Sequence, residues 1–143
     1  MSVTVADMAR AIEHTLLRPE ATPQQVDVLC DEALRYGFAG VCVNPIYVRR
    51  AAERLTLTQV RSSKIEDRNG MRQTFSGCPS RSVFELRTSN FELRRSPIVV
   101  ATVGFPLGVS LTDTKADEAR RAINDGAREI DMVVALGALT AGD

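Results

Sequence analysis

Two short, continuous apolar runs constrain the fold of this chain more than any other feature of its sequence. One run covers residues 38–43 and the other covers residues 98–103, and both are rich in β-branched valine. Runs of this length and composition are typical of strands that are buried on both faces, as in a parallel sheet covered by helices. Asn44-Pro45 ends the first run, and turn residues between Gly104 and Gly108 end the second.

Helical patterns alternate with these strands. Thr22 can cap a helix that begins at Pro23 and is ended by Gly37. Apolar residues at helical spacing predict a second helix after the first apolar run, and they are Ile46, Val48, Ala51, Ala52 and Leu55. Thr112 or Asp113 can cap a third helix.

The chain repeats one βα unit in register. Gly126 ends the third helix as Gly37 ends the first, and residues 129–134 form the strand that follows. Cys42 lies five residues after Gly37, and Asp131 lies five residues after Gly126. Residues 12–17 add a first strand. Strands that alternate with helices predict a parallel α/β fold, which both an open doubly wound sheet and a closed barrel satisfy.

Composition and charge exclude several classes of function. With 143 residues the chain has the size of one domain, and its 18 basic and 18 acidic residues balance, so no global charge attracts nucleic acid or an anionic membrane. One histidine, His14, and three widely spaced cysteines (Cys30, Cys42 and Cys78) supply neither a metal site nor a catalytic triad. Without a signal peptide or a long apolar stretch, the chain is expected to be cytosolic (cytoplasmic).

Residues 56–97 do not fit the βα pattern. They hold eight basic and four acidic residues, a net charge of +4, so the remaining residues carry −4. Phe84-Glu85-Leu86-Arg87 is repeated seven residues later as Phe91-Glu92-Leu93-Arg94. Because loops between a helix and a strand usually have about two to six residues, we interpret 56–97 as an insert, either disordered or a marginal hairpin. A nucleic-acid-binding loop is a further alternative for this insert, but a net charge of +4 is a thin basis for it, since base stacking and phosphate contacts need organised surfaces.

Three groups of residues outside this insert resemble the deoxyribose-phosphate aldolase family, in the same order. They are Ile12-Glu13-His14-Thr15-Leu16-Leu17-Arg18-Pro19, then Gly40-Val41-Cys42-Val43-Asn44-Pro45, and then Ala101-Thr102-Val103-Gly104-Phe105-Pro106-Leu107-Gly108 with Glu129-Ile130-Asp131-Met132-Val133. The resemblance covers residues 11–55 and 98–143. It implies an eight-stranded (βα)8 TIM barrel, of which this chain supplies about the first four βα units. The chain is then a single incomplete barrel domain, 1–143, interrupted at 56–97.

The resemblance also implies an activity. The family consists of class I aldolases, carbon–carbon lyases of deoxyribonucleotide catabolism that cleave 2-deoxyribose 5-phosphate reversibly to glyceraldehyde 3-phosphate and acetaldehyde. The reaction proceeds through a Schiff base on a lysine of the sixth strand and needs no metal or cofactor. Lys64 and Lys115, the only lysines here, match no catalytic position and are interpreted as solvated surface charges. We therefore expect the chain to be inactive alone.

The resemblance further implies a set of site residues. Asp131 matches an aspartate that transfers protons through water; the alternative is a backbone brace, but a carboxylate in a buried strand is costly to desolvate without a purpose. Cys42 matches a cysteine that lines the substrate pocket, or is a small core residue. Thr15 matches a residue that faces the substrate, or is only a strand former. Glu13 stands where many relatives carry aspartate, and His14 beside it can be structural or functional.

Alternatives to a phosphosugar aldolase stay open. A half-barrel has two free sheet edges, which could pair with a second copy or with a separate C-terminal half. A non-catalytic interaction protein and the product of a disrupted gene are both consistent with the sequence.

The loop at 104–108 is expected on the active-site face, and it lacks the glycine pattern of a dinucleotide-binding loop.

Overall fold

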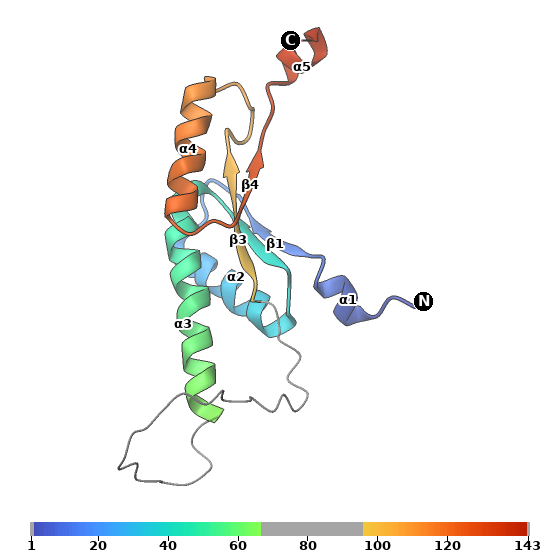
Figure 1. Cartoon of the computed structure of the whole chain (residues 1–143), viewed down its shortest axis with the longest axis vertical. Helices are drawn as coiled ribbons and strands as arrows, with labels where there is room; N and C mark the ends of the chain where they lie inside the picture. The colour runs from blue at the N-terminus through green and yellow to red at the C-terminus, as the bar shows by residue number, and fades with distance from the viewer. Residues whose placement is uncertain (1, 67–95, 143) are drawn as a thin grey trace, which may run out of the picture.

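The computed structural model describes residues 2–66 and 96–142. Its elements, shown in Figure 1, are α1 (Val5–Ala9), β1 (Glu13–Leu16), α2 (Pro23–Tyr36), β2 (Gly40–Val43), the 3-10 turn η1 (Pro45–Tyr47), α3 (Val48–Glu66), β3 (Ile98–Val103), α4 (Thr112–Asn124), β4 (Glu129–Met132) and α5 (Leu136–Ala141). Helices and strands alternate from β1 to β4, as the sequence predicts.

The described strands form one parallel sheet in the order β1-β2-β3-β4. An open doubly wound sheet would instead reverse its strand order at a switch point. The helix α2 packs against β1 and β2, α3 packs against β3, and α4 packs against β3 and β4; Figure 1 shows α3 and α4 along the same side of the sheet. Strands in sequence order, with their connecting helices on one face, form part of a barrel wall.

One apolar core holds the helices to the sheet. Alternate residues of β2 and β3 supply Val41, Val43, Val99 and Ala101. The helices supply the facing residues, which are Val26, Leu29, Cys30 and Ala33 from α2, Val48, Ala51 and Leu55 from α3, and Ala122 from α4. All of β2 is buried, as is β3 beyond its first residue, so the predicted burial of these strands on both faces is confirmed.

The ends of α2 form as predicted, whereas the start of α4 does not. Thr22 accepts a hydrogen bond from the first turn of α2 and closes a capping box, and Gly37 ends that helix with a φ of 71°. The prediction of Thr112 or Asp113 as the cap of α4 is wrong. The N-cap position belongs to Leu111, whose side chain cannot accept a hydrogen bond. Asp113 lies in the first turn, where its charge interacts favourably with the helix dipole.

The helix α3 is longer than the sequence predicts. It runs to Glu66, so residues 56–66, which we expected to lie outside any regular element, continue a helix. The tandem repeat, and the disorder or hairpin predicted around it, fall on residues 67–95 and lie outside the described residues.

Two arginine–aspartate pairs fix α3 beside α2. Arg50 donates two hydrogen bonds to Asp27, at 2.9 and 2.7 Å, and Arg54 donates two to Asp31, at 2.9 and 2.6 Å. The hydrogen bonds from Arg50 hold the pKa of Asp27 below its usual value. Since water screens exposed ion pairs, these contacts orient the two helices more than they stabilise the core.

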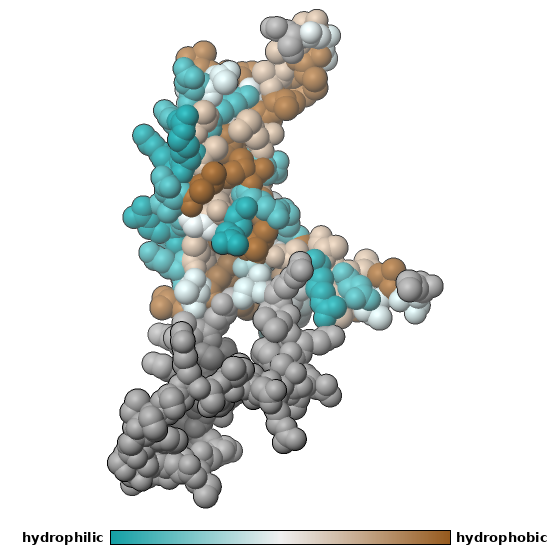
Figure 2. Space-filling view, in the orientation of Figure 1, coloured by the Kyte–Doolittle hydropathy of each residue, from teal (hydrophilic) through white to brown (hydrophobic). Residues whose placement is uncertain are grey.

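Both outer strands expose one edge. Within residues 2–66 and 96–142, β1 pairs only with β2 and β4 pairs only with β3. The helices α1 and α5 project from the sheet without burying a residue. Figure 2 shows apolar surface along α5 and the segment leading to it. The large exposed apolar residues of this region are Met132, Val134, Leu136 and Leu139. Among the described helices, none is long and apolar enough to cross a membrane.

The turn after α4 depends on a glycine. Gly126 has a φ of 109°, and a Cβ atom there would lie 2.7 Å from the Cβ of Ala52 on α3. We expect Gly126→Ala to lower the free energy of unfolding by about 1–3 kcal/mol, through backbone strain and overlap together. Urea denaturation measures the change.

Two further glycine variants serve as controls. Gly37→Ala introduces the strain of a φ of 71° with no atom within 4 Å, and Gly137→Ala meets no atom within 4 Å in a helix. Gly137→Ala should leave stability unchanged, and Gly37→Ala should cost less than Gly126→Ala. Equal losses in all three variants would contradict the contact with Ala52.

Candidate active site

Polar side chains from all four strands share the sheet face that the helices leave uncovered. Because side chains alternate along a strand, Glu13, Thr15, Cys42, Thr102 and Asp131 point away from the core residues beside them. Thr15 pairs in register with Cys42, and Thr102 pairs with Asp131. The three site residues that the sequence predicts, Thr15, Cys42 and Asp131, therefore lie on one face of the sheet.

Thr102 is the member of this face that sequence reasoning missed. It lies in an apolar run, and such a run predicts core residues rather than site residues. A signal was available: in a buried strand whose other members are valine, alanine and isoleucine, threonine adds a hydroxyl group that needs a partner.

The thiol of Cys42 is buried between two carboxylates. Its residue is 3% exposed. Burial, and to a smaller extent the negative charges of Asp131 and Glu13, raise the pKa of the Cys42 thiol to about 11. The carboxylates therefore act on the same point of the face, and the thiol stays protonated near neutral pH. A neutral thiol lines a pocket but is a poor nucleophile.

The prediction that Asp131 lies in a buried strand is wrong. β4 is an edge strand, and Glu129, Asp131 and Met132 are exposed there. Desolvation consequently gives no argument for a role of this carboxylate. Its case depends instead on the face of the sheet that it shares with Thr15 and Cys42.

His14 lies outside the candidate site. Its Nε2 atom is 2.7 Å from Oε2 of Glu32 on α2, and its ring packs edge-on against Phe38 with the ring centres 5.4 Å apart. Of the two alternatives left open by the sequence, this geometry favours the structural one: His14 braces β1 against α2.

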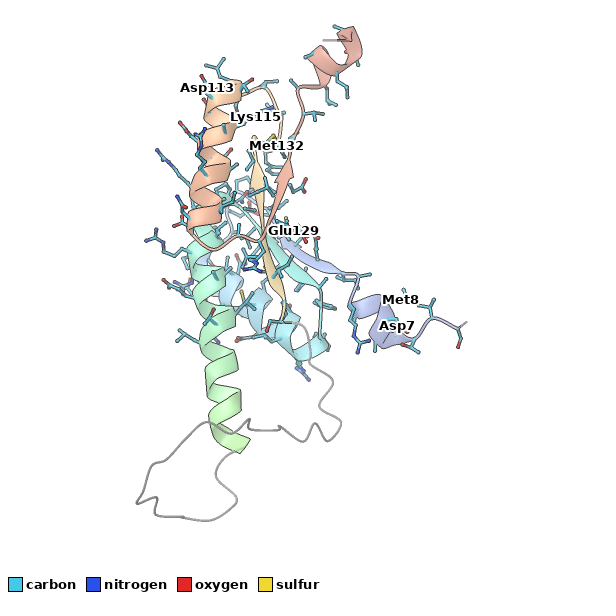
Figure 3. All side chains as sticks on the ribbon, in the orientation of Figure 1. Asp7, Met8, Asp113, Lys115, Glu129 and Met132 are labelled. Carbon is cyan, nitrogen blue, oxygen red and sulfur yellow. The ribbon has the colours of Figure 1, made fainter. Side chains whose placement is uncertain are left out.

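The side chains of Lys115 and Glu118 on α4 hold the loop that follows β3. The ammonium of Lys115 donates to the carbonyl oxygens of Gly108, at 2.6 Å, and Val133, at 2.9 Å. Glu118 accepts from the N–H of Gly104 at 2.7 Å. Figure 3 shows Lys115 at the carboxyl end of the sheet, beside β4. The interpretation of Lys115 as a solvated charge is wrong, because its ammonium joins the loop to the strand end.

Gly104 and Gly108 allow this loop to close on the strand end. Their φ angles are 67° and 69°, in the left-handed region. A Cβ atom on Gly108 would lie 2.1 Å from the carbonyl oxygen of Val134, so only glycine fits the observed backbone. The loop lies at the carboxyl end of β3, the edge at which barrel enzymes place their active sites.

The described part of the face offers acid–base groups rather than metal ligands. Within residues 2–66 and 96–142, no three His, Cys, Asp or Glu side chains gather as a metal site would require. A solvated carboxylate beside a neutral thiol and hydroxyl groups can accept, donate and relay protons.

Comparison with curated proteins finds deoxyribose-phosphate aldolases among the relatives of this chain. No family model matches the chain. The chain is 37% identical over 137 residues to the deoxyribose-phosphate aldolase of Thermococcus gammatolerans, which covers 96% of this chain and 45% of the relative. It is also 40% identical to deoxyribose-phosphate aldolase 2 of Staphylococcus aureus over 134 residues. That match covers 94% of this chain and 44% of the relative.

Solved structures agree with these relatives. A crystal structure of a deoxyribose-phosphate aldolase from Coccidioides immitis matches 99% of this chain and 41% of its own, with 34% identity and a TM-score of 0.69. The chain is similar to the N-terminal half of a deoxyribose-phosphate aldolase. The tetrameric aldolase from Aeropyrum pernix matches with 25% identity and a TM-score of 0.62, over 94% of this chain and 42% of its own.

The similarity to these aldolases indicates which part of a barrel the sheet corresponds to. The chain spans about half the length of the curated relatives that it matches. Its four parallel strands and their helices form a partial TIM barrel. The uncovered face, with Thr15, Cys42 and Asp131, corresponds to the inside of that barrel, which in this fold lies opposite the helices.

The raised pKa of Cys42 predicts slow alkylation. With a pKa of about 11, roughly one molecule in ten thousand carries the thiolate at pH 7, and the fraction rises about tenfold per pH unit until the pH nears the pKa. Iodoacetamide labelling, followed by mass spectrometry of the Cys42 peptide between pH 7 and 10, should show this rise. Cys30, whose pKa burial raises to about 12, should react more slowly still. Rapid labelling of Cys42 at pH 7 would contradict its burial.

Proposed function

We propose that this chain forms the proton-transfer half of a deoxyribose-phosphate aldolase. The reaction is the reversible cleavage of 2-deoxyribose 5-phosphate to glyceraldehyde 3-phosphate and acetaldehyde. The observation that carries the proposal is the 37% identity to an aldolase across 96% of the chain. The location of Asp131 beside Thr102, on the face of Thr15 and Cys42, supports it.

The proposed mechanism divides the chemistry between two halves of a barrel. An unprotonated lysine, supplied by segments outside the residues that match here, would attack the aldehyde and form the Schiff base. Asp131 would then move protons to and from the reacting carbons through a water molecule. Thr15 and Cys42 would line the pocket, and the protonated thiol adds no charge beside the iminium group.

The proposed partner is the complementary half of the barrel. The free edges of β1 and β4, and the apolar surface along α5 in Figure 2, offer the contacts that such a half would need. A homo-oligomer is a further proposal, supported by the tetramer described for the Aeropyrum pernix aldolase. A non-catalytic interaction protein would use the same edges, and it differs from the aldolase by assembling without turnover.

Two sequence-based expectations belong to this proposal. We propose that residues 56–97 interrupt the barrel as an insert, with the part up to Glu66 extending α3. A cytosolic location is the other expectation, and cell fractionation would test it.

The 143-residue chain by itself should form no Schiff base. The Lys115 ammonium already donates hydrogen bonds to two carbonyl oxygens, and the protonated amine that makes them is not a nucleophile. Incubation with deoxyribose 5-phosphate and borohydride should leave the mass of every lysine-containing peptide unchanged, with borohydride alone as the control. Co-expression with the C-terminal half of the Thermococcus gammatolerans aldolase should restore turnover. Turnover by the isolated chain, with an adduct on one of its lysines, would refute the division into halves; assembly without turnover would favour the interaction protein.

In the co-expressed complex, Asp131→Asn should lower turnover by about a hundredfold to ten-thousandfold, the usual loss when a general acid–base group is removed. Borohydride trapping of the substrate should persist, because the lysine belongs to the other half. The matched control is Glu129→Gln, which removes an exposed carboxylate two residues earlier on the same strand, labelled in Figure 3. Turnover near that of the wild type in Asp131→Asn would remove this residue from the mechanism.

A further inference from the structure

Thr102 has a buried hydroxyl group without a hydrogen-bond partner. The residue is 1% exposed, and its Oγ1 is the one buried side-chain oxygen or nitrogen among the described residues that bonds to nothing. Buried hydroxyl groups in folded proteins nearly always have a partner, since desolvation without one is unfavourable. The unpaired oxygen therefore needs a physical explanation.

The position of Thr102 indicates where a partner for its hydroxyl group would lie. Its neighbour Ala101 packs in the core on the helix side, and side chains alternate along a strand, so the side chain of Thr102 points to the opposite face of the sheet. There it lies beside Asp131 in register, one strand away from Cys42. Valine would fill the same volume without an unpaired hydroxyl. The extra oxygen makes sense if something else on this face bonds to it.

The charges on this face select the kind of group that can bind there. Asp131 lies beside Thr102 in register, and Glu13 lies on the same face of the sheet, so the region beside Thr102 carries negative charge. A phosphate group would be repelled from it. A neutral hydroxyl or carbonyl group suits it, because a threonine hydroxyl can donate to an oxygen and accept from a hydroxyl.

We propose that Thr102 is a substrate-binding residue, whose hydroxyl bonds to an uncharged hydroxyl or carbonyl oxygen in the aldehyde part of the phosphosugar. The inference rests on the proposed aldolase function. It adds a contact on β3 to those of Thr15 on β1 and Asp131 on β4. The three residues then hold the reacting end of the substrate from three of the four strands.

Thr102→Val tests the proposal, because it removes the hydroxyl and keeps the shape. In the isolated chain its urea midpoint should equal or exceed that of the wild type, since no partner is lost. In the complex with the C-terminal aldolase half, kcat/KM for deoxyribose 5-phosphate should fall roughly tenfold to a hundredfold. Thr102→Ser, which keeps the hydroxyl, should restore most of this loss. Thr114→Val, which removes an exposed hydroxyl on α4, is the control that should leave both measurements unchanged.

The outcomes separate this inference from the function on which it rests. If the wild-type complex turns over and Thr102→Val retains the full kcat/KM, the inference fails and the aldolase proposal stands. A lower urea midpoint for Thr102→Val in the isolated chain would also overturn the inference, because the hydroxyl would then have a structural partner. If the wild-type complex assembles without turnover, the aldolase proposal fails and the inference falls with it.

Discussion

Burial of the helix-facing side of β2 and β3 is the constraint on which the rest of the structure depends. Val41, Val43, Val99 and Ala101 form one side of the core, and three helices form the other. Because side chains alternate, fixing these residues inward fixes their neighbours outward, and a shift of one residue would exchange the two sets. The packing that stabilises the fold thus also determines which side chains face the candidate site.

The uncovered face combines buried and solvated groups in a definite order. Cys42 and Thr102 belong to the two central strands and are buried, whereas Asp131 belongs to an edge strand and is exposed. The negative charge of Asp131 helps to hold the thiol of Cys42 neutral. A carboxylate near neutral hydrogen-bonding groups can take part in proton transfer.

The loop after β3 links the helix layer to the site. Glu118 and Lys115 lie one helical turn apart on α4 and bind the two ends of this loop, at Gly104 and Gly108. Lys115 also binds Val133, so one side chain joins α4, the loop and the end of β4. A lysine whose ammonium is bound to backbone carbonyl oxygens positions the loop and does not act as a nucleophile. This role depends on contacts in the folded chain, so the helical pattern around Lys115 could not predict it.

Residues close together in the chain were enough to predict local structure: the bounds of β3, the capped start of α2 and its end at Gly37. The resemblance to aldolases also assigned Thr15, Cys42 and Asp131 to one site, and the register of the strands places them on one face. The folded structure was needed to establish the strand order, the length of α3, the exposure of Asp131, the hydrogen bonds of Lys115 and the unpaired hydroxyl of Thr102. Most of these features depend on which distant segments pair or pack, and burial or a hydrogen-bond partner belongs to the folded contact rather than to the residue type.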